Sequence, residues 1–249
     1  MRLDRATALA FSGRLRSATS ALDAVDAGLP DHERPDARWL RAYLLAATGA
    51  FSDAETIARE LIEHPDRVVR ARATVTLGSV LRQTDRHAEA LDIESAALSA
   101  PSTADLRKHL LIGSAADSVG LGDLAGVDAA LAQVGSELVG GWRAGVRLRW
   151  VRCERELLAS DPSEAARWAR RALALAERAE ARRHQAKSLL FLGAALREVV
   201  ARSGGARARE ARVDALASLG AARTIARRIG AEPIATVAHD LFGLLSRRG

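Results

Sequence analysis

Apolar and small residues recur along the chain with the spacing of amphipathic helices, in blocks separated by short polar turns. The pattern predicts six antiparallel helix pairs and a last helix that covers the open end of the sixth pair. The predicted pairs span residues 3–12 with 15–27, 36–48 with 51–63, 67–83 with 86–99, 103–120 with 123–134, 141–159 with 162–182, and 184–202 with 206–230, and the last helix spans 233–247.

A small residue near the start of each second helix returns at an almost constant interval. The first five are Ala18, Ala54, Ala90, Val127 and Ala165, at spacings of 36, 36, 37 and 38 residues. A fixed period in this range is typical of a stacked helical array, in which each unit buries its apolar face against its neighbours. We therefore expect one elongated domain over residues 1–249.

The sixth pair departs from this period. Its matching small residue is Ala215, 50 residues after Ala165. We expect an insertion at about 202–212, which forms either a basic loop or an extended helix end.

Helix ends agree with the pairs. Ser52 with Glu55, and Asp161 with Glu164, have the three-residue spacing of a capping arrangement, and Pro162 stands at a first helical position. Both pairs are predicted to satisfy backbone N–H groups at a helix start.

Composition favours an all-α protein without cofactor chemistry. Only 4% of the residues are aromatic, and Arg accounts for 35 of the 37 basic residues. Cys153 is the single cysteine, so no disulfide framework or zinc-thiolate cluster is expected, and we predict a buried thiol. The six histidines lie far apart in sequence, which gives metal binding no local support.

No segment has the pattern of a membrane span. The longest uncharged run, Ala42 to Ser52, falls far short of the roughly 20 residues that a membrane helix needs. Asp4 and Arg5 interrupt the start, where a signal peptide has an unbroken apolar core. We expect a soluble, cytoplasmic protein.

Positive charge is concentrated in the C-terminal part of the chain. Residues 143–249 carry 22 Lys and Arg against 11 Asp and Glu, whereas residues 1–142 carry 15 against 20. This excess can attract nucleic acid, an anionic membrane surface or an acidic protein, or it can be an ordinary solvated helix surface. The same two interpretations apply to the stripe of Arg167, Arg171, Arg178 and Arg182.

Two stretches carry small and large residues in the order of the tetratricopeptide repeat. They are Leu77-Gly78, Leu81, Ala90, Ala97 and Pro101, and, one unit earlier, Gly49, Phe51, Ala54 and Ala58. The chain resembles this family over nearly its whole length, and the resemblance implies a right-handed α-α superhelix. The longer period and the runs at 172–177 and 226–230 resemble the arrays of maltose-regulator-type bacterial transcription activators.

The resemblance also implies a binding groove. In tetratricopeptide proteins, the first helix of each pair lines a concave surface through one stripe of positions. Carried onto this sequence, that stripe gives a basic groove with aromatic anchors. Its candidate ligand-binding residues are Trp39, Tyr43, Arg72, Val75, Ser79, Arg82, His109, Ile112, Arg147, Trp150, Glu154, Lys187, Leu190 and Arg197.

The groove departs from the carboxylate-clamp subclass of the family. That subclass places Lys and Asn where this chain has Trp39 with Tyr43, and Val75 with Ser79. Arginine and aromatic anchors suit an apolar or acidic peptide instead. Trp39 and Trp150 are either such anchors or packing residues between adjacent repeats.

The sequence therefore favours a non-catalytic interaction scaffold or regulatory adaptor that binds a peptide or a partner helix. The alternative is a nucleic-acid-associated regulator that uses the basic C-terminal part, although no helix-turn-helix is recognised. An enzyme is not expected, because no nucleophile with a base, paired-carboxylate motif or phosphate-binding glycine loop is present. No cofactor or metal is predicted.

Overall fold

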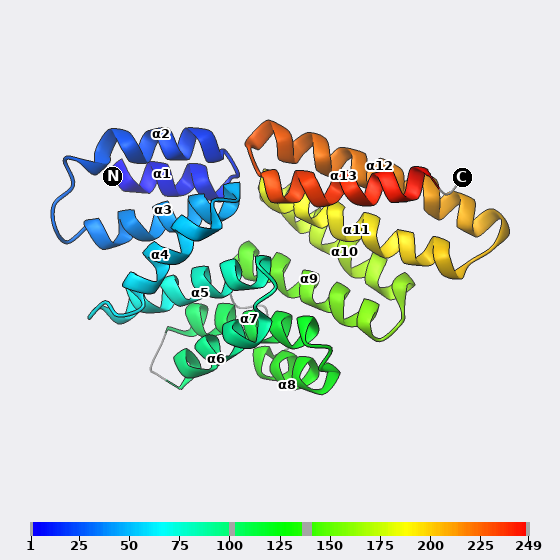
Figure 1. Ribbon diagram of the computed structural model, residues 1–249, viewed down its shortest axis with the longest axis horizontal. Coiled ribbons are helices and arrows are strands. Elements are labelled where there is room, and N and C mark those ends of the chain that lie inside the picture. Colours follow the sequence, from blue (N-terminus) through cyan, green and yellow to red (C-terminus); the bar gives the residue numbers. More distant parts are fainter. Residues whose placement is uncertain (1, 100–102, 136–140, 248–249) are drawn as a thin grey trace. The chain divides into compact units, whose positions relative to one another are not determined.

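A computed structural model describes residues 2–99, 103–135 and 141–247, and the regular structure throughout these ranges is α-helical (Figure 1). Every predicted helix end lies within four residues of the observed end, so the all-α fold is confirmed. The helices are α1 (Arg2–Phe11), α2 (Leu15–Asp26), α3 (Arg34–Thr48), α4 (Phe51–Leu61), α5 (Arg67–Gln83), α6 (His87–Leu98), α7 (Ala104–Gly120), α8 (Leu124–Val134), α9 (Trp142–Leu158), α10 (Pro162–Arg178), α11 (Arg182–Arg202), α12 (Gly205–Ile229) and α13 (Glu232–Ser246).

The helices belong to two compact units, residues 1–140 with α1–α8 and residues 141–249 with α9–α13. In the first unit, consecutive helices form pairs, and α3 also packs on α5, as α5 does on α7. In the second unit, α9 pairs with α10 and α11 with α12, while α11 contacts α9 and α13 packs on α12. A single domain over the whole chain stays a prediction.

The periodic small residues lie on the buried side of the second helix in each pair. Ala18, Ala54, Ala90, Val127 and Ala165 are all fully buried, as is Ala215 of the sixth pair. Small side chains at these positions allow close helix packing, and larger neighbours such as Leu22, Leu77 and Leu219 fill the remaining space. The repeat period therefore follows the burial of these positions.

The turn inside each of the first five pairs has the same backbone conformation. Five residues before each periodic small residue, φ is positive. The following N–H donates a hydrogen bond to the carbonyl five residues earlier at 2.8–2.9 Å, which ends the first helix as a Schellman motif does. The five residues are Gly13 (82°), Gly49 (102°), Asp85 (60°), Gly122 (73°) and Ser160 (67°).

One of the two predicted caps is confirmed. The Asp161 carboxylate accepts a hydrogen bond from the Glu164 backbone N–H at 2.9 Å, and Pro162 occupies the first turn of α10. The Ser52 and Glu55 cap is wrong, because α4 already begins at Phe51 without a side-chain cap. Glu55 instead accepts hydrogen bonds from Arg59 and Arg86.

The insertion in the sixth pair lengthens both helices. α11 runs to Arg202 and α12 starts at Gly205, so only two residues separate them. Arg202 and Arg207 then reach the preceding pair, where they donate hydrogen bonds to the Ser160 carbonyl at 2.9 Å and to Ser163 Oγ at 2.8 Å. The extended-helix alternative is therefore the correct one. Pro101, part of the family resemblance, lies outside the described residues.

Candidate functional site

The second unit contains an aromatic and cationic stripe on the neighbouring first helices α9 and α11. We call Trp142, Trp150, His184, Lys187 and Phe191 the aromatic stripe. His184 lies between two indole rings, stacked on Trp150 at 5.4 Å and edge-on to Trp142 at 4.8 Å between ring centroids. Phe191 continues the stripe, 5.9 Å from Trp150.

Lys187 carries positive charge onto this stripe. Its ammonium nitrogen lies 4.9 Å from the Trp150 ring centroid and 5.6 Å from that of Phe191, within cation–π range of both rings. The Lys187 side chain is half-buried, so the charge stays next to solvent. The arrangement combines flat apolar surface with a fixed cation.

His184 is the neutral member of the stripe. Burial, aided by the positive charges of Arg183, Arg143, Lys187 and Arg147, holds the pKa of His184 well below its usual value. Its imidazole is therefore uncharged at neutral pH, and the positive potential comes from the lysine and arginines. Its buried Nδ1 has no hydrogen-bond partner within the described ranges of the chain.

The stripe includes two of the six predicted groove residues of this unit, and the other four lie beside it on α9 and α11. Trp150 is only 6% exposed, so it presents little surface of its own. The remaining candidates are half-buried, and Arg197 pairs with Glu198 at 2.7 Å. They are Arg147, Glu154, Leu190 and Arg197.

The first unit places a similar group around Trp39. Its indole N–H donates to Thr76 Oγ1 at 3.1 Å, and the Arg72 guanidinium lies 5.2 Å from the ring centroid. Arg72 also pairs with Asp36 at 2.7 Å, and the Tyr43 ring lies 6.3 Å from the indole. Trp39 is 9% exposed, so this unit also buries its tryptophan between first helices.

The other predicted residues of the first unit differ in accessibility. Val75 and Ser79 are half-buried on α5, where a ligand can reach part of each side chain. His109 and Ile112 are buried in α7, with Ile112 only 1% exposed. These two residues belong to the packing of the unit.

Arg82 is the centre of a buried group of charges that we call the ionic cluster. Its Nη1 lies 2.7 Å from Asp117 Oδ2 and 3.1 Å from Glu94 Oε1, and both carboxylates are fully buried. His87 Nδ1 lies 3.4 Å from the other Asp117 oxygen. The guanidinium predicted to meet a ligand is thus held by two internal carboxylates.

Sequence reasoning did not single out Glu94, although a signal was present. The matching residue in the other five pairs is apolar, namely Leu22, Ala58, Leu131, Ala169 and Leu219. Gly78 and Gly113 make room for the carboxylate, because a Cβ at either position would stand within 2.1 Å of a Glu94 oxygen. A lone acid in an apolar repeat position therefore marks this buried cluster.

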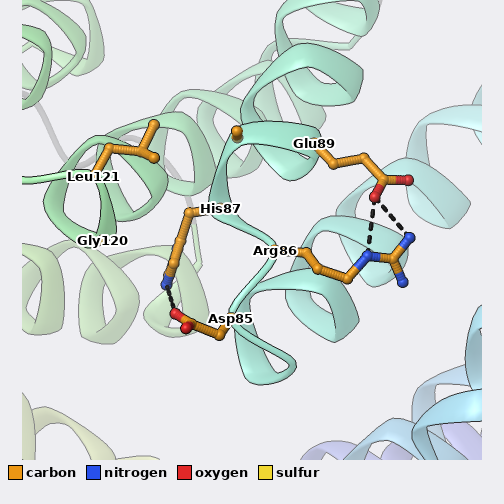
Figure 2. A pocket seen from close by; sticks show the side chains of 7 residues that line it. Asp85, Arg86, His87, Glu89, Gly120 and Leu121 are labelled. Carbon is orange, nitrogen blue, oxygen red and sulfur yellow. Dashed lines mark hydrogen bonds and ion pairs between the residues drawn. The ribbon is translucent and has the colours of Figure 1, made fainter.

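An open hollow of about 410 Å³ lies at the turn before α6, beside the end of α7 (Figure 2). Its charged residues bind one another: Arg86 lies 2.6 Å from Glu89, and His87 Nε2 lies 3.6 Å from Asp85. His87 rests against Gly120, where a Cβ would stand 2.3 Å from the ring. The hollow therefore offers a ligand few groups that are not already engaged.

The described residues contain no group of three or more His, Cys, Asp or Glu side chains arranged to hold a metal ion. Cys153 is fully buried, and its burial, with the nearby Glu154 and Glu156, raises the pKa of the thiol well above its usual value. The thiol is thus a core group, as predicted. Of the helices described, none combines the length and apolar character that crossing a bilayer demands.

Comparisons with known proteins support the repeat fold. No family model and no curated protein matches the chain. Among solved structures, PlcR of Bacillus thuringiensis, crystallised with the peptide PapR7 and DNA, aligns at a TM-score of 0.60 and 12% identity, over 87% of this chain and 82% of PlcR. A Rap protein complexed with competence and sporulation factor aligns at 0.54 and 11% identity, over 93% and 80%.

At these identities the likeness concerns the fold alone. Both neighbours are helical repeat proteins of the tetratricopeptide type. The finer resemblance to maltose-regulator arrays stays a prediction. The chain thus has an all-α fold of paired helices in a tetratricopeptide-like repeat.

Proposed function

We propose that this protein is a non-catalytic regulatory adaptor and that its second unit binds a peptide on the aromatic stripe. The observation that carries the proposal is the position of the Lys187 ammonium group over the rings of Trp150 and Phe191, next to the buried His184. Aromatic side chains such as Trp and Phe are enriched at protein–protein interfaces.

The chemistry of the stripe favours a peptide with apolar and acidic side chains. Lys187 and Arg147 supply positive charge, whereas Glu154 is the single carboxylate among the predicted groove positions of this unit. A peptide carboxylate near Lys187 gains a charge-assisted contact, and an apolar side chain covers the exposed part of Phe191.

Rigid presentation supports the same function. The stripe lies on two long helices that pack against each other and against α10. Because these helices are ordered in advance, a bound peptide bears most of the ordering cost itself. The complexes of PlcR with the peptide PapR7 and of a Rap protein with competence and sporulation factor support peptide binding by this protein.

Calorimetric titration with synthetic peptides tests the proposal. The panel contains Leu- and Phe-rich peptides in which the remaining positions are Glu, Gln or Lys. We expect the Glu peptides to bind most tightly, the Gln peptides less tightly and the Lys peptides least. Lys187→Glu with Arg147→Glu reverses this order, because the charge on the stripe changes sign.

The matched control changes the same number of charges elsewhere in the unit. Arg209→Glu with Arg228→Glu alters two exposed arginines of α12. We expect this control to keep the wild-type order of peptides. An equal loss of Glu-peptide binding in both double variants would contradict the proposed site, as would a preference of the wild-type protein for Lys peptides.

A further inference from the structure

A second group of residues in the same unit forms a compact arginine face. Arg149 and Arg152 lie three residues apart on α9, and Trp168, Arg171 and Arg178 recur on one side of α10. The two helices lie side by side in the second unit (Figure 1). We call these five residues the arginine face.

The five side chains meet across the two helices. Trp168 has the Arg152 and Arg171 guanidinium carbons each 4.6 Å from its ring centroid. Burial, together with the positive charges of Arg152, Arg171 and Arg178, lowers the pKa of Arg149. Arg171 and Arg178 are exposed and the other three are half-buried, so solvent reaches the group.

No carboxylate pairs with the four arginines within the described part of the chain. Arg149 donates one hydrogen bond, from Nη1 to the Gly145 carbonyl at 2.8 Å, and its buried Nε has no partner. The carboxylates nearest along the same helix sides, Glu156 and Glu164, pair with Arg155 and Arg167. The positive charge of the face is therefore not neutralised by these two helices.

Other arginines of the protein show how different this arrangement is. Arg41 pairs with Asp23 and Asp26, each at 2.9 Å, and Arg86 pairs with Glu55 and Glu89. Four arginines gathered without an acid repel one another, and an anionic ligand relieves that repulsion.

The arginine face is separate from the aromatic stripe. On an α-helix, successive residues turn by about 100°, so the direction midway between Arg149 and Arg152 lies about 160° around α9 from the direction midway between Arg147 and Trp150. A ligand on one side of α9 therefore does not contact the other side. Binding at the arginine face is therefore independent of peptide binding on the aromatic stripe.

We propose that the arginine face binds the phosphate backbone of single-stranded nucleic acid. Arginine forks match phosphate oxygens in a bidentate way, which favours phosphate over carboxylate side chains on flexible stems. Arg171 and Arg178 stand about 10 Å apart along α10, which exceeds the reach of one phosphate and fits a row of them. The guanidiniums on Trp168 give an unpaired base a flat cationic surface on which to stack.

Fluorescence anisotropy of a labelled single-stranded oligonucleotide tests this inference. We expect the wild-type protein to bind at about 20 mM salt. For each phosphate contact, the logarithm of the affinity falls by about 0.7 when the salt concentration rises tenfold. Arg152→Gln with Arg171→Gln and Arg178→Gln removes three contacts, so the slope falls by about 2. We also expect affinity at low salt to fall by at least about tenfold.

Arg149 is left unchanged in this variant because its Nε is buried and its Nη1 is bonded to the Gly145 carbonyl. Thermal unfolding checks that the variant is folded. The matched control replaces three exposed arginines of α12, Arg209, Arg227 and Arg228, by Gln. If the arginine face is the binding surface, this control keeps at least half of the wild-type slope of log affinity against log salt. A control that loses as much affinity as the face variant overturns the inference.

Competition then identifies the chemistry of the ligand. Unlabelled oligonucleotide displaces the probe, whereas polyglutamate of the same charge displaces it much less. Equal displacement by polyglutamate overturns phosphate recognition, and tighter binding of a duplex of equal length overturns the role of unpaired bases. Absence of binding by the folded wild-type protein at low salt overturns the whole inference.

Discussion

The indole N–H of Trp150 donates a hydrogen bond to the Ser188 hydroxyl at 2.9 Å, across one repeat of the chain. Trp39 makes the corresponding bond to Thr76 at 3.1 Å. In both units, a buried indole on one first helix therefore binds a hydroxyl on the next first helix. Of the two roles open from the sequence, packing between repeats is the one that these contacts support.

Ser188→Ala tests this relationship. The substitution leaves the buried Trp150 N–H without its acceptor, and we expect the free energy of unfolding to fall by about 1–3 kcal/mol. In a Trp150→Phe background the same substitution costs less, because no N–H remains to be satisfied. Urea unfolding of the single and double variants measures the difference.

Ser218→Ala is the control for that experiment. Ser218 is also buried, but its hydroxyl donates to the Asp214 carbonyl inside its own helix. We expect a loss below about 1 kcal/mol. Equal losses at Ser188 and Ser218 would show that the hydrogen bond between the two first helices adds no more to the free energy of unfolding than a hydrogen bond within one helix.

Arg82→Met is predicted to destabilise the first unit strongly. The change leaves Glu94 and Asp117 buried next to each other without their shared cation, at a cost of about 3–5 kcal/mol. Adding Glu94→Gln and Asp117→Asn removes the two charges and should recover at least about 1 kcal/mol. Calorimetry or urea unfolding at neutral pH measures both variants.

Arg72→Met is the matched control, because Arg72 makes a single ion pair with Asp36 and is half-buried. We expect it to cost no more than about 1 kcal/mol. A loss at Arg82 as small as that at Arg72 would mean that the ionic cluster does not hold α5, α6 and α7 together.

Most of the fold could be predicted from the sequence because each helix pair repeats one local pattern. Periodic small residues such as Ala54 and Ala90 mark the buried side of the second helices, and Ala215 is buried in the same way although the insertion places it 50 residues after Ala165. Helix bounds depend on caps and turns, which are set by the few residues around each helix end. The exception at Ser52 arose because the Gly49 turn starts α4 before that residue.

Much less of the candidate site could be predicted, because a stripe on a helix does not show which side chains the next helix covers. Trp150 lies on the first helix α9, yet Ser188 and His184 of α11 contact its ring. Arg82 lies on the first helix α5, but its guanidinium is bonded to acids 12 and 35 residues away. The sequence predicts that α9 and α10 form a pair, but its pattern does not show that Arg152 of α9 meets Trp168 of α10.

The buried His184 predicts loss of stability in mild acid. Burial lowers its pKa in the folded protein, so below about pH 6.5 the unfolded chain binds a proton that the folded protein does not. Stability is therefore complete above that pH and falls as pH decreases, by about 1.4 kcal/mol per pH unit for this one group. Urea unfolding at about pH 7.5 and 5.5 measures the difference.

His184→Phe keeps a ring between Trp142 and Trp150 but does not titrate. We expect this variant to lose most of the change in stability between the two pH values. Some change remains from His87, whose pKa is also lowered by burial. If His184→Phe shows the full wild-type dependence on pH, the neutral state of His184 is wrong.

Replacement of Ser160 by Gly is predicted to stabilise the protein. Ser160 adopts φ of 67° in the turn between α9 and α10, whereas three of the five equivalent turns use Gly. The left-handed conformation costs a residue with a Cβ about 1–2 kcal/mol, partly offset by the greater freedom of Gly in the unfolded chain. We expect a net gain of about 0.5–1 kcal/mol in urea unfolding. Gly49→Ala, at φ of 102°, is expected to lose at least about 1 kcal/mol, and if both changes left stability unaltered, the shared turn conformation would not constrain the repeat.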